Sequence, residues 1–367
     1  MKVTPWEVSG KIDYNKLIDQ FGVKPFNFAL PKKLQDNLLF RRNIIFAHRD
    51  FERILDCIKN KKKFVMMTGL MPSGKFHLGH KMLADQIILY QKLGAKIYLT
   101  VADVEAYNSR NTNIDELKKI AIEEYLTNYI ALGLKKKNLD FYFQSKRSKD
   151  GKKSNAFYNL AAIAARHATF NEFRSIYGDI TPAKMSSSLL QTADMLHPQL
   201  EEFEGPIPTL VPVGIDQDPH LKISRDISQR IKFHNFTQLS STYHTFLPGL
   251  SSEKMSSSDP NSYIALTDSE ETVTNKIKKY AFSGGQPTLK EHKEKGGNPD
   301  IDTSFILLKY FFEPNDKKLQ TLHDRYSSGS LLTSDLKDIT ITKINSFLKT
   351  HQKKREKAKS QINSYLN

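Results

Sequence analysis

The sequence predicts an α/β protein: a Rossmann-like, doubly wound parallel sheet followed by an all-helical C-terminal domain. Between residues 63 and 264, short apolar runs alternate with longer segments of helical periodicity, and this alternation is typical of strand–helix–strand units in a parallel sheet. After about residue 268 no strand-like run remains, and the chain keeps helical periodicity to its end. With 367 residues, the chain is long enough for a nucleotide-binding domain and a smaller companion.

The predicted elements follow each other in a regular order. Residues 1–62 are predicted to form a helical lead-in that packs on the α/β domain, because segments such as 51–60 carry apolar residues at helical spacing. The buried strands are predicted at residues 64–68, 96–102, 139–145 and 208–215. The helix after the second strand is capped by Asn113, a residue type that favours helix N-termini. The predicted domains are therefore residues 1–62, 63–264 and 265–367.

Composition narrows the function classes. The net charge of +15 favours a polyanionic partner, because bound lysines and arginines release counterions from nucleic acid; the alternative is a charge that only serves solubility. The densest basic run, residues 351–359, is a candidate phosphate contact. The single cysteine, Cys57, excludes an internal disulfide and a cysteine-based metal site. No apolar run approaches the ~18 residues of a membrane span, and the start lacks a secretion signal, so we expect a cytoplasmic protein without a membrane partner.

The loop after the first predicted strand matches a phosphate-binding loop only in part. Gly69, Gly74 and Lys75 fit the first positions of the pattern G-x-x-x-x-G-K-[ST]. The pattern ends in a hydroxyl that ligates magnesium, which Phe76 lacks, and Pro72 removes one backbone N–H donor. The sequence therefore argues against a phosphate-loop kinase or ATPase.

The helix after this loop opens with the segment His-Leu-Gly-His, residues 77–80. Imidazoles three residues apart, here His77 and His80, share one face of a helix, beside an N-terminus that favours anions. Gly79 allows a flat ring to lie close to the backbone. The alternative is a pair of histidines that only cap a helix, which the surrounding loop, strand and glycine disfavour. The segment indicates a nucleotide site.

Together with a Lys-Met-Ser-Ser-Ser segment far downstream, His-Leu-Gly-His resembles the HIGH and KMSKS signatures of class I aminoacyl-tRNA synthetases. The second segment occurs twice, at residues 184–188 and 254–258. In the family, this signature stands just before the helical domain, so the resemblance makes the second copy the active one. The first copy precedes a helical pattern, and Ser186 or Ser187 is expected to cap that helix. Whether Lys184 also contacts a phosphate stays open.

The resemblance implies the chemistry of amino-acid activation. The substrate carboxylate attacks the α-phosphorus of ATP, and the enzyme positions it and stabilises charge on the phosphates. By resemblance, His77 and His80 contact the triphosphate, and Lys254 moves onto the leaving pyrophosphate, with Ser256 as a further catalytic residue. The expected ATP-binding residues are Thr68, Gly69, Gly79, Gly214, Asp216, Lys254 and Met255. Mg²⁺ is expected to accompany the ATP, without a metal site formed by the protein.

Other segments narrow the resemblance to tryptophanyl-tRNA synthetases of archaeal and eukaryotic type, over nearly the whole chain. They include residues 212–226, where Asp-Gln is followed by Asp-Pro, and residues 254–268. The resemblance implies L-tryptophan and tRNA(Trp) as substrates, a homodimer, and an anticodon-binding role for residues 265–367. The alternative is a tyrosyl enzyme of the same subclass. Because His77, His80 and Lys254 are all present, a non-enzymatic synthetase-like nucleic-acid binder is disfavoured.

The expected amino-acid pocket departs in part from the eukaryotic pattern. Where those enzymes hold the indole N–H with a tyrosine and a glutamine, this chain has Met67 and Thr100. A buried unpaired donor costs about 1–3 kcal/mol, so another acceptor is needed, and Asp194 matches the bacterial-type aspartate. The alternative is that Asp194 is an exposed helical residue. The expected tryptophan-binding residues are Met67, Glu105, Gln191, Asp194 and Gln217, with Glu105 on the ammonium group.

Overall fold

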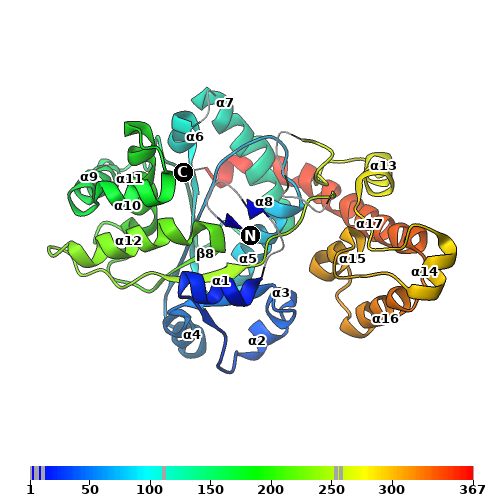
Figure 1. The fold of residues 1–367 in the computed structure, drawn as a ribbon. Helices are drawn as coiled ribbons and strands as arrows, with labels where there is room; N and C mark the ends of the chain where they lie inside the picture. Colours follow the sequence, from blue (N-terminus) through cyan, green and yellow to red (C-terminus); the bar gives the residue numbers. More distant parts are fainter. Residues whose placement is uncertain are drawn as a thin grey trace.

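The structure is a computed structural model that describes residues 2–3, 8–9, 13–109, 113–251, 255 and 259–366. Its centre is a seven-stranded sheet in the order β3-β4-β9-β8-β5-β6-β7 (Figure 1). The strands are β3 (Lys24–Pro25), β4 (Ile45–Arg49), β5 (Val65–Leu70), β6 (Lys96–Val101), β7 (Leu139–Phe143), β8 (Thr209–Gly214) and β9 (Ser240–His244). A separate two-stranded sheet pairs β1 (Lys2–Val3) with β2 (Val8–Ser9).

Five of these strands form a parallel sheet with doubly wound connectivity. β5 pairs with β6 on one side and with β8 on the other, and β7 and β9 extend the two halves. From β7 to β9, the sequence order of the strands is third, second, first, fourth and fifth. The order reverses between β5 and β8, and this switch point is where such sheets bind ligands. The predicted Rossmann-like fold is confirmed.

Helices cover both faces of the sheet, as the alternation of β5 residues shows. Met66 belongs to a core with α4, α5, α8 and the C-terminal helices, whereas Val65 and Met67 belong to a core with α1 and α9–α12. The helices involved are α1 (Tyr14–Phe21), α4 (Phe51–Asn60), α5 (Leu78–Lys92), α6 (Asp103–Ser109), α7 (Ile114–Ile120), α8 (Thr127–Leu132), α9 (Gly151–Ala164), α10 (Phe170–Tyr177), α11 (Pro182–Leu196) and α12 (Asp218–Arg230). A π-helical turn, Ala121–Leu126, joins α7 to α8.

The N-terminal segment is not purely helical, and this part of the prediction is wrong. β4 pairs antiparallel with β9, and β3 pairs antiparallel with β4, so residues 24–49 widen the sheet. The short helices α2 (Lys32–Gln35) and α3 (Leu38–Arg41) lie between them. The domain boundary near residue 62 stays a prediction.

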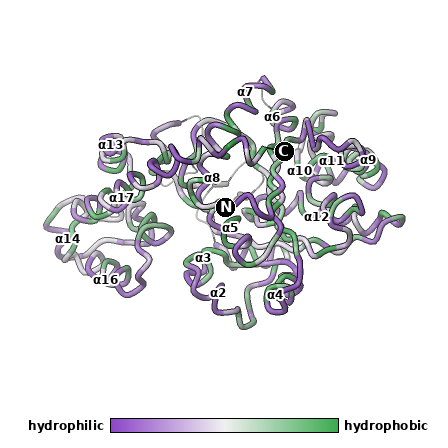
Figure 2. Tube along the Cα trace, turned by 180° about the vertical axis from the view of Figure 1, so that it is seen from behind, coloured by the Kyte–Doolittle hydropathy of each residue, from purple (hydrophilic) through white to green (hydrophobic). Residues whose placement is uncertain are grey.

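The C-terminal region is helical, as predicted. It contains α13 (Glu270–Tyr280), α14 (Leu289–Lys295), α15 (Thr303–Leu307), a π-helical turn (Leu308–Phe312), α16 (Asp316–Ser327) and α17 (Thr333–Lys359). Figure 2 shows that α14, at the outer edge of this region, is largely hydrophilic. None of the described helices is both long and apolar enough to cross a membrane.

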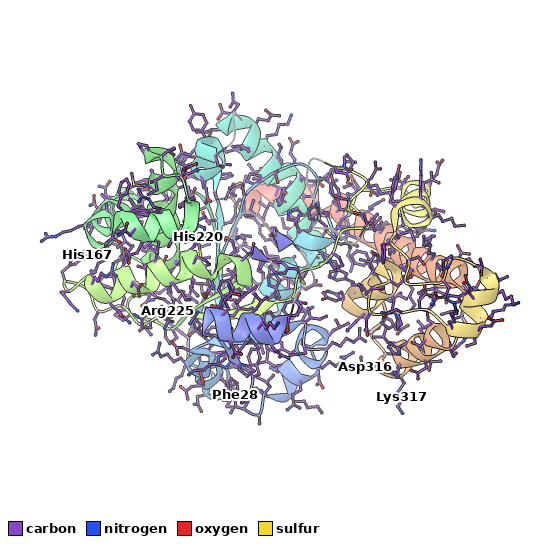
Figure 3. All side chains as sticks on the ribbon, in the orientation of Figure 1. Phe28, His167, His220, Arg225, Asp316 and Lys317 are labelled. Atoms are coloured by element: carbon purple, nitrogen blue, oxygen red, sulfur yellow. The ribbon has the colours of Figure 1, made fainter. Side chains whose placement is uncertain are left out.

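The helical region contacts the rest of the molecule at several places, among them α3 and α8. At the end of α3, Arg41 and Arg42 each donate from Nε to a carboxylate oxygen of Asp316, at 2.8 Å in both cases. Asp316 is labelled in Figure 3. At the other end of the region, α17 packs against α8, where His351 Nε2 lies 2.8 Å from Asn128 Oδ1. The chain therefore ends beside the α/β domain, as the C label in Figure 1 shows.

Candidate active site

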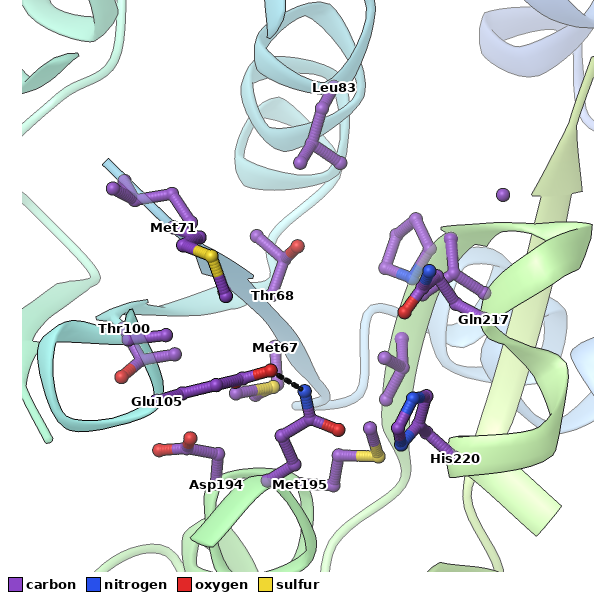
Figure 4. A pocket seen from close by; sticks show the side chains of 18 of the residues that line it. Met67, Thr68, Met71, Leu83, Thr100, Glu105, Asp194, Met195, Gln217 and His220 are labelled. Carbon is purple, nitrogen blue, oxygen red and sulfur yellow. Dashed lines mark hydrogen bonds between the residues drawn. The ribbon is translucent and has the colours of Figure 1, made fainter. Parts of the chain in front are cut away.

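A cavity of about 380 Å³ lies at the carboxyl ends of β5, β6 and β8, beside the switch point of the sheet. Figure 4 shows Glu105 and Asp194 on one side of it and Gln217 and His220 on the other. The cavity brings together every residue expected to bind tryptophan: Met67, Glu105, Gln191, Asp194 and Gln217. It is also lined by residues expected at the nucleotide, namely Thr68, Gly69, Gly79, His80 and Gly214.

The loop between β5 and α5 has Phe76 at the position where the phosphate-binding pattern G-x-x-x-x-G-K-[ST] has its hydroxyl. Phe76, which stands where the hydroxyl would be, is fully buried. Its ring packs edge-on against Tyr125 and Tyr129, with centroids 5.4 and 5.3 Å away. Phe76 therefore fixes the loop on the core and offers no ligand to a metal ion.

His77 and His80 cap the start of α5 reciprocally. Nδ1 of His77 accepts from the Gly79 N–H at 3.1 Å, and the His77 N–H donates to Nδ1 of His80, also at 3.1 Å. The two rings lie 3.8 Å apart between centroids. Because both Nδ1 atoms are acceptors, each neutral ring carries its hydrogen on Nε2.

Both rings are neutral at physiological pH. Burial, with the charge of Lys276 as a smaller cause, lowers the pKa of His77 to about 4. Burial and the neighbouring His77 lower the pKa of His80 well below its usual value. His77 can therefore stabilise a phosphate oxygen as an N–H donor rather than as a cation, whereas Nε2 of His80 lies 3.3 Å from the hydroxyl of Tyr125.

The absence of a side chain at Gly79 allows His77 and Met255 to lie close to the backbone at the start of α5. A Cβ atom here would lie 2.9 Å from Cε1 of His77 and 3.3 Å from the sulfur of Met255. The second Lys-Met-Ser-Ser-Ser segment thus reaches the first turn of α5 through its methionine. Lys254 and Ser256, the predicted catalytic residues of that segment, lie outside the described residues.

Glu105 lies in α6 and is almost fully buried at the cavity wall. Its Oε1 accepts from Nε2 of Gln191 at 2.6 Å, the contact drawn as a dashed line in Figure 4. Burial raises the pKa of Glu105 to about 7; the bond from Gln191 opposes this shift and the charge of Asp194 adds to it. A cationic ligand at this carboxylate would favour its ionised form.

Asp194 is buried in α11, with 2% of its surface exposed, so the alternative of an exposed helical aspartate is wrong. Its two oxygens accept from Tyr142 Oη at 2.6 Å and from Gln144 Nε2 at 2.7 Å. Burial raises the pKa of Asp194 to about 6, against the lowering effect of these hydrogen bonds. The carboxylate keeps unused lone-pair directions, because an ionised carboxylate has about four acceptor sites.

A family description matches most of the chain. The family of class I tRNA synthetases (W and Y) matches residues 59–349. The chain belongs to this family. The fold, the buried histidine pair and the cavity described above thus belong to a class I synthetase catalytic domain.

Named relatives cover nearly the whole chain. The Tryptophan--tRNA ligase of Methanocaldococcus jannaschii is 44% identical over 98% of this chain and 96% of its own length. The same-named protein of Aeropyrum pernix is 40% identical over the same shares. The crystal structure of tryptophanyl-tRNA synthetase from Aeropyrum pernix K1 superimposes with a TM-score of 0.91 at 39% identity, covering 100% of this chain and 99% of that one. A tryptophanyl-tRNA synthetase from Encephalitozoon cuniculi, bound to tryptophan, gives 0.83 at 27% identity and covers 98% and 99%.

In this class I synthetase, the end of β8 positions two of the residues expected to bind ATP, Gly214 and Asp216. A Cβ at Gly214 would lie 2.4 Å from Oδ1 of Asp216, so a larger residue here would force this carboxylate to move. Asp216 is buried in the 3₁₀ turn Ile215–Gln217 and accepts from Nε2 of Gln217 at 3.1 Å. Among the residues that the structure describes, no group of three or more metal-ligating side chains occurs.

The first Lys-Met-Ser-Ser-Ser segment starts a helix, as predicted, but the predicted cap is wrong. Thr181, not Ser186 or Ser187, caps α11 and accepts from the Lys184 N–H at 3.2 Å, because Pro182 follows it at the first helical position. Nζ of Lys184 donates to the carbonyl of Asp179 at 2.9 Å. Lys184 lines a neighbouring cavity of about 440 Å³ instead of the one beside His80.

Sequence reasoning missed two polar residues that face Asp194. Tyr142 and Gln144 lie two positions apart, in β7 and directly after it, and therefore on one face of the strand. Gln144 donates to Asp194 and accepts from the Glu105 N–H at 3.2 Å, so it ties both carboxylate-bearing helices to β7. The period-two spacing in residues 139–145 was the available signal.

Proposed function

We propose that this protein is a tryptophan–tRNA ligase. It activates L-tryptophan with ATP, forms tryptophanyl-adenylate and pyrophosphate, and then transfers tryptophan to the 3′ end of tRNA(Trp). The observation that carries this proposal is one cavity that holds two buried carboxylates, Glu105 and Asp194, next to the neutral histidine pair. The 44% identity to a protein named Tryptophan--tRNA ligase supports the same conclusion.

The proposed tryptophan contacts follow from the charges in the cavity. Glu105, with Gln191 and Gln217, binds the polar end of the substrate, because its carboxylate would pair with the ammonium group. Met67 packs on the indole face through its polarizable thioether. Asp194 accepts the indole N–H as a third hydrogen bond, beside those from Tyr142 and Gln144.

The same arrangement disfavours tyrosine as the substrate. A phenol hydroxyl read by a carboxylate donates its hydrogen and needs a donor for its own oxygen. Two donors beside Asp194, the Tyr142 hydroxyl and the Gln144 amide, already bond to Asp194 itself. Met67 offers no donor, and a site that reads a hydroxyl relies on paired hydrogen bonds.

Activation then needs positioning and charge stabilisation rather than an acid or a base. A carboxylate oxygen of tryptophan bonds to the α-phosphorus as the bond to the pyrophosphate oxygen breaks. We assign His77 to the phosphate oxygens as an N–H donor and His80, whose ring lies against His77, to holding it in place. We assign Lys254 with Ser256 to the pyrophosphate. Mg²⁺ bound with the ATP supplies further charge neutralisation; it would be held mainly by phosphate oxygens and water, since the described residues offer no cluster of ligands.

The remaining assignments rest on charge and on family resemblance. The net charge of +15 suits a tRNA substrate. We assign residues 265–367 to anticodon binding, and we propose a homodimer in the cytoplasm. In the basic run 351–359, Arg355 is paired with Glu124 at 2.7 Å, so this residue is not a free phosphate contact. Lys353 and Lys354 in the same run are exposed and remain available for such a contact.

Charging of tRNA tests this proposal. We expect labelled tryptophan to attach to a tRNA(Trp) transcript in the presence of ATP and Mg²⁺, and a tRNA(Tyr) transcript to remain uncharged with tyrosine. A His77→Ala variant should lose charging while it still binds free tryptophan. Charging of tRNA(Tyr) with tyrosine, or of neither tRNA, would overturn the proposal.

A further inference from the structure

A π-helical turn contacts the loop between β5 and α5. The turn, Ala121–Leu126, interrupts the helix between α7 and α8, and such turns are rare and frequent at functional sites. Two consecutive side chains of the turn, Glu124 and Tyr125, both contact the loop between β5 and α5. Neither residue lines the cavity described above.

Tyr125 binds the loop backbone and one of the histidines. Its hydroxyl donates to the carbonyl of Ser73 and accepts from the Ser73 N–H, and both distances are 3.2 Å. It also lies 3.3 Å from Nε2 of His80. Since Nδ1 of His80 accepts from the His77 N–H, Nε2 carries the hydrogen and donates to Tyr125. The His77 N–H thus sets the tautomer of His80, and the Tyr125 hydroxyl sets the orientation of its ring.

Glu124 binds the same loop three residues further on. Its Oε1 accepts from the Phe76 N–H at 3.0 Å, directly before His77. Its Oε2 accepts from Nη2 of Arg355 in α17 at 2.7 Å. The two side chains of this ion pair are only 15% and 17% exposed, so the pair is shielded from solvent and holds Glu124 in place.

We propose that this π-helical turn is a positioning element for ATP activation: Tyr125 orients His80, and Glu124, held by Arg355 from the C-terminal helix, fixes the loop backbone at Phe76. The inference rests on the proposed function, since it assumes that the triphosphate binds at His77, whose ring lies against that of His80. Glu124 and Tyr125 are positioning residues that act through the loop. We therefore expect substitutions of these residues to lower kcat and to leave the tryptophan KM nearly unchanged.

The variant Tyr125→Phe tests the first contact, with Tyr129→Phe as a matched control. The control removes a buried hydroxyl one turn further along and keeps the ring that packs on Phe76. In tryptophan-dependent ATP–pyrophosphate exchange, we expect kcat of Tyr125→Phe to fall roughly tenfold or more, because small displacements at a reacting centre are costly. The tryptophan KM should stay within about twofold of the wild-type value. Equal losses in both variants, or a kcat unchanged by Tyr125→Phe, would overturn the proposal.

The variant Arg355→Gln tests the second contact against Lys349→Gln. Both substitutions remove one positive charge from α17, but only the first unpairs Glu124. We expect a lower kcat for exchange without tRNA in Arg355→Gln and an unchanged kcat in Lys349→Gln. A loss of similar size in the two variants would mean that charge on the helix, and not the contact with Glu124, matters.

Amide hydrogen exchange gives a readout that does not depend on activity. In Glu124→Ala, the Phe76 amide should lose protection by tenfold or more, while amides of the β6 strand keep theirs. Unchanged protection at Phe76 would refute the positioning role even if the enzyme is active. A further outcome separates this inference from the proposed function. If the wild-type protein shows no ATP–pyrophosphate exchange with tryptophan, but the Phe76 amide loses protection in Glu124→Ala, the proposed function fails and the anchoring of the loop by Glu124 stands.

Discussion

The two carboxylates of the cavity differ in their partners, and this difference assigns them to different parts of the substrate. Glu105 accepts one hydrogen bond, from Gln191, and its pKa is raised to about 7 by burial. Asp194 accepts two, from Tyr142 and Gln144, and its pKa is raised only to about 6. Glu105 accepts fewer hydrogen bonds, so its carboxylate gains most from pairing with an ammonium ion. Asp194 accepts more, so it suits a neutral N–H donor.

Asp194→Ala is expected to weaken tryptophan binding selectively. The variant loses the acceptor of the indole N–H and leaves the buried donors of Tyr142 and Gln144 unpaired. A lost hydrogen bond to a charged group costs about 1.5–3 kcal/mol, so the tryptophan KM should rise by roughly 10- to 100-fold. The ATP KM, measured in the same exchange assay, should change little. Equal increases of both constants would remove Asp194 from the indole role.

Tryptophan affinity is expected to depend on pH through Glu105. Because the pKa of this carboxyl in the free protein is about 7, it is largely protonated below that pH and cannot pair with an ammonium group. The dissociation constant, measured by equilibrium dialysis without ATP, should therefore rise as the pH falls below 7, by up to about tenfold per pH unit. The Glu105→Gln variant should bind weakly and lack this part of the dependence. A wild-type constant that is flat between pH 6 and 8 would contradict the assignment.

Among the elements, the two Lys-Met-Ser-Ser-Ser segments have the same sequence but different neighbours. The first lies in α11, where Thr181 caps the helix and Lys184 bonds to a carbonyl. The second places Met255 against the first turn of α5. The first copy therefore lies at the start of a helix, whereas the methionine of the second copy lies against the first turn of α5.

Lysine substitutions should separate the two segments. We expect Lys254→Gln to reduce kcat of ATP–pyrophosphate exchange by roughly 100-fold or more, as loss of a group that stabilises charge in the transition state does. Lys184→Gln should stay within about twofold of the wild-type rate, because its amine bonds to the Asp179 carbonyl away from the cavity. A large loss in Lys184→Gln would show that the first segment also takes part in catalysis.

Elements with a strong local pattern could be predicted from the sequence, and others could not. The apolar runs of β5, β6, β7 and β8 were predicted within two residues at each end, and the start of α7 was predicted at its cap, Asn113. The α-helices that follow β6 and β8, namely α6 and α12, were not predicted. β9 was missed because its sequence, Ser-Ser-Thr-Tyr-His, has no apolar run, although four of its five residues are buried. β4 was missed because it follows short helices, and only its long-range pairing with β9 makes it a strand.

In the candidate site too, some residues could be predicted from the sequence and others could not. Family motifs located Glu105, Gln191 and Asp194, and the structure brings them into one cavity. Tyr142 and Gln144 carry no motif, and their contacts with Asp194 span about fifty residues of chain. Such contacts depend on which strands are neighbours, which local patterns do not determine.

At the scale of the whole molecule, buried histidines connect stability to pH. The pKa of each of these residues is lowered from its usual value, with burial as the largest cause: His48, His77, His80, His197, His220, His244 and His351. They are distributed over the sheet, both helical layers and α17. Each therefore takes up a proton less readily in the folded protein than in the unfolded chain.

The protein is expected to lose stability in mild acid. Below pH 6.5 the unfolded chain takes up protons on these histidines before the folded protein does, so the free energy of unfolding falls as the pH drops from 6.5 towards 4. Glu105 and Asp194, whose pKa values are raised, act in the opposite direction but are outnumbered. The midpoint of thermal unfolding should therefore be clearly lower at pH 5 than at pH 7. A midpoint that does not change over this range would contradict the burial of neutral histidines.

The central claim is that a class I catalytic site in this molecule activates tryptophan and rejects tyrosine. Amino-acid-dependent ATP–pyrophosphate exchange, with the two amino acids compared side by side on the wild-type protein, tests it most directly. The arrangement of Glu105, Asp194 and Met67 around one cavity predicts exchange with tryptophan and none above background with tyrosine. Exchange with tyrosine at a comparable rate would contradict the account of specificity, and exchange with neither would contradict the proposed activity.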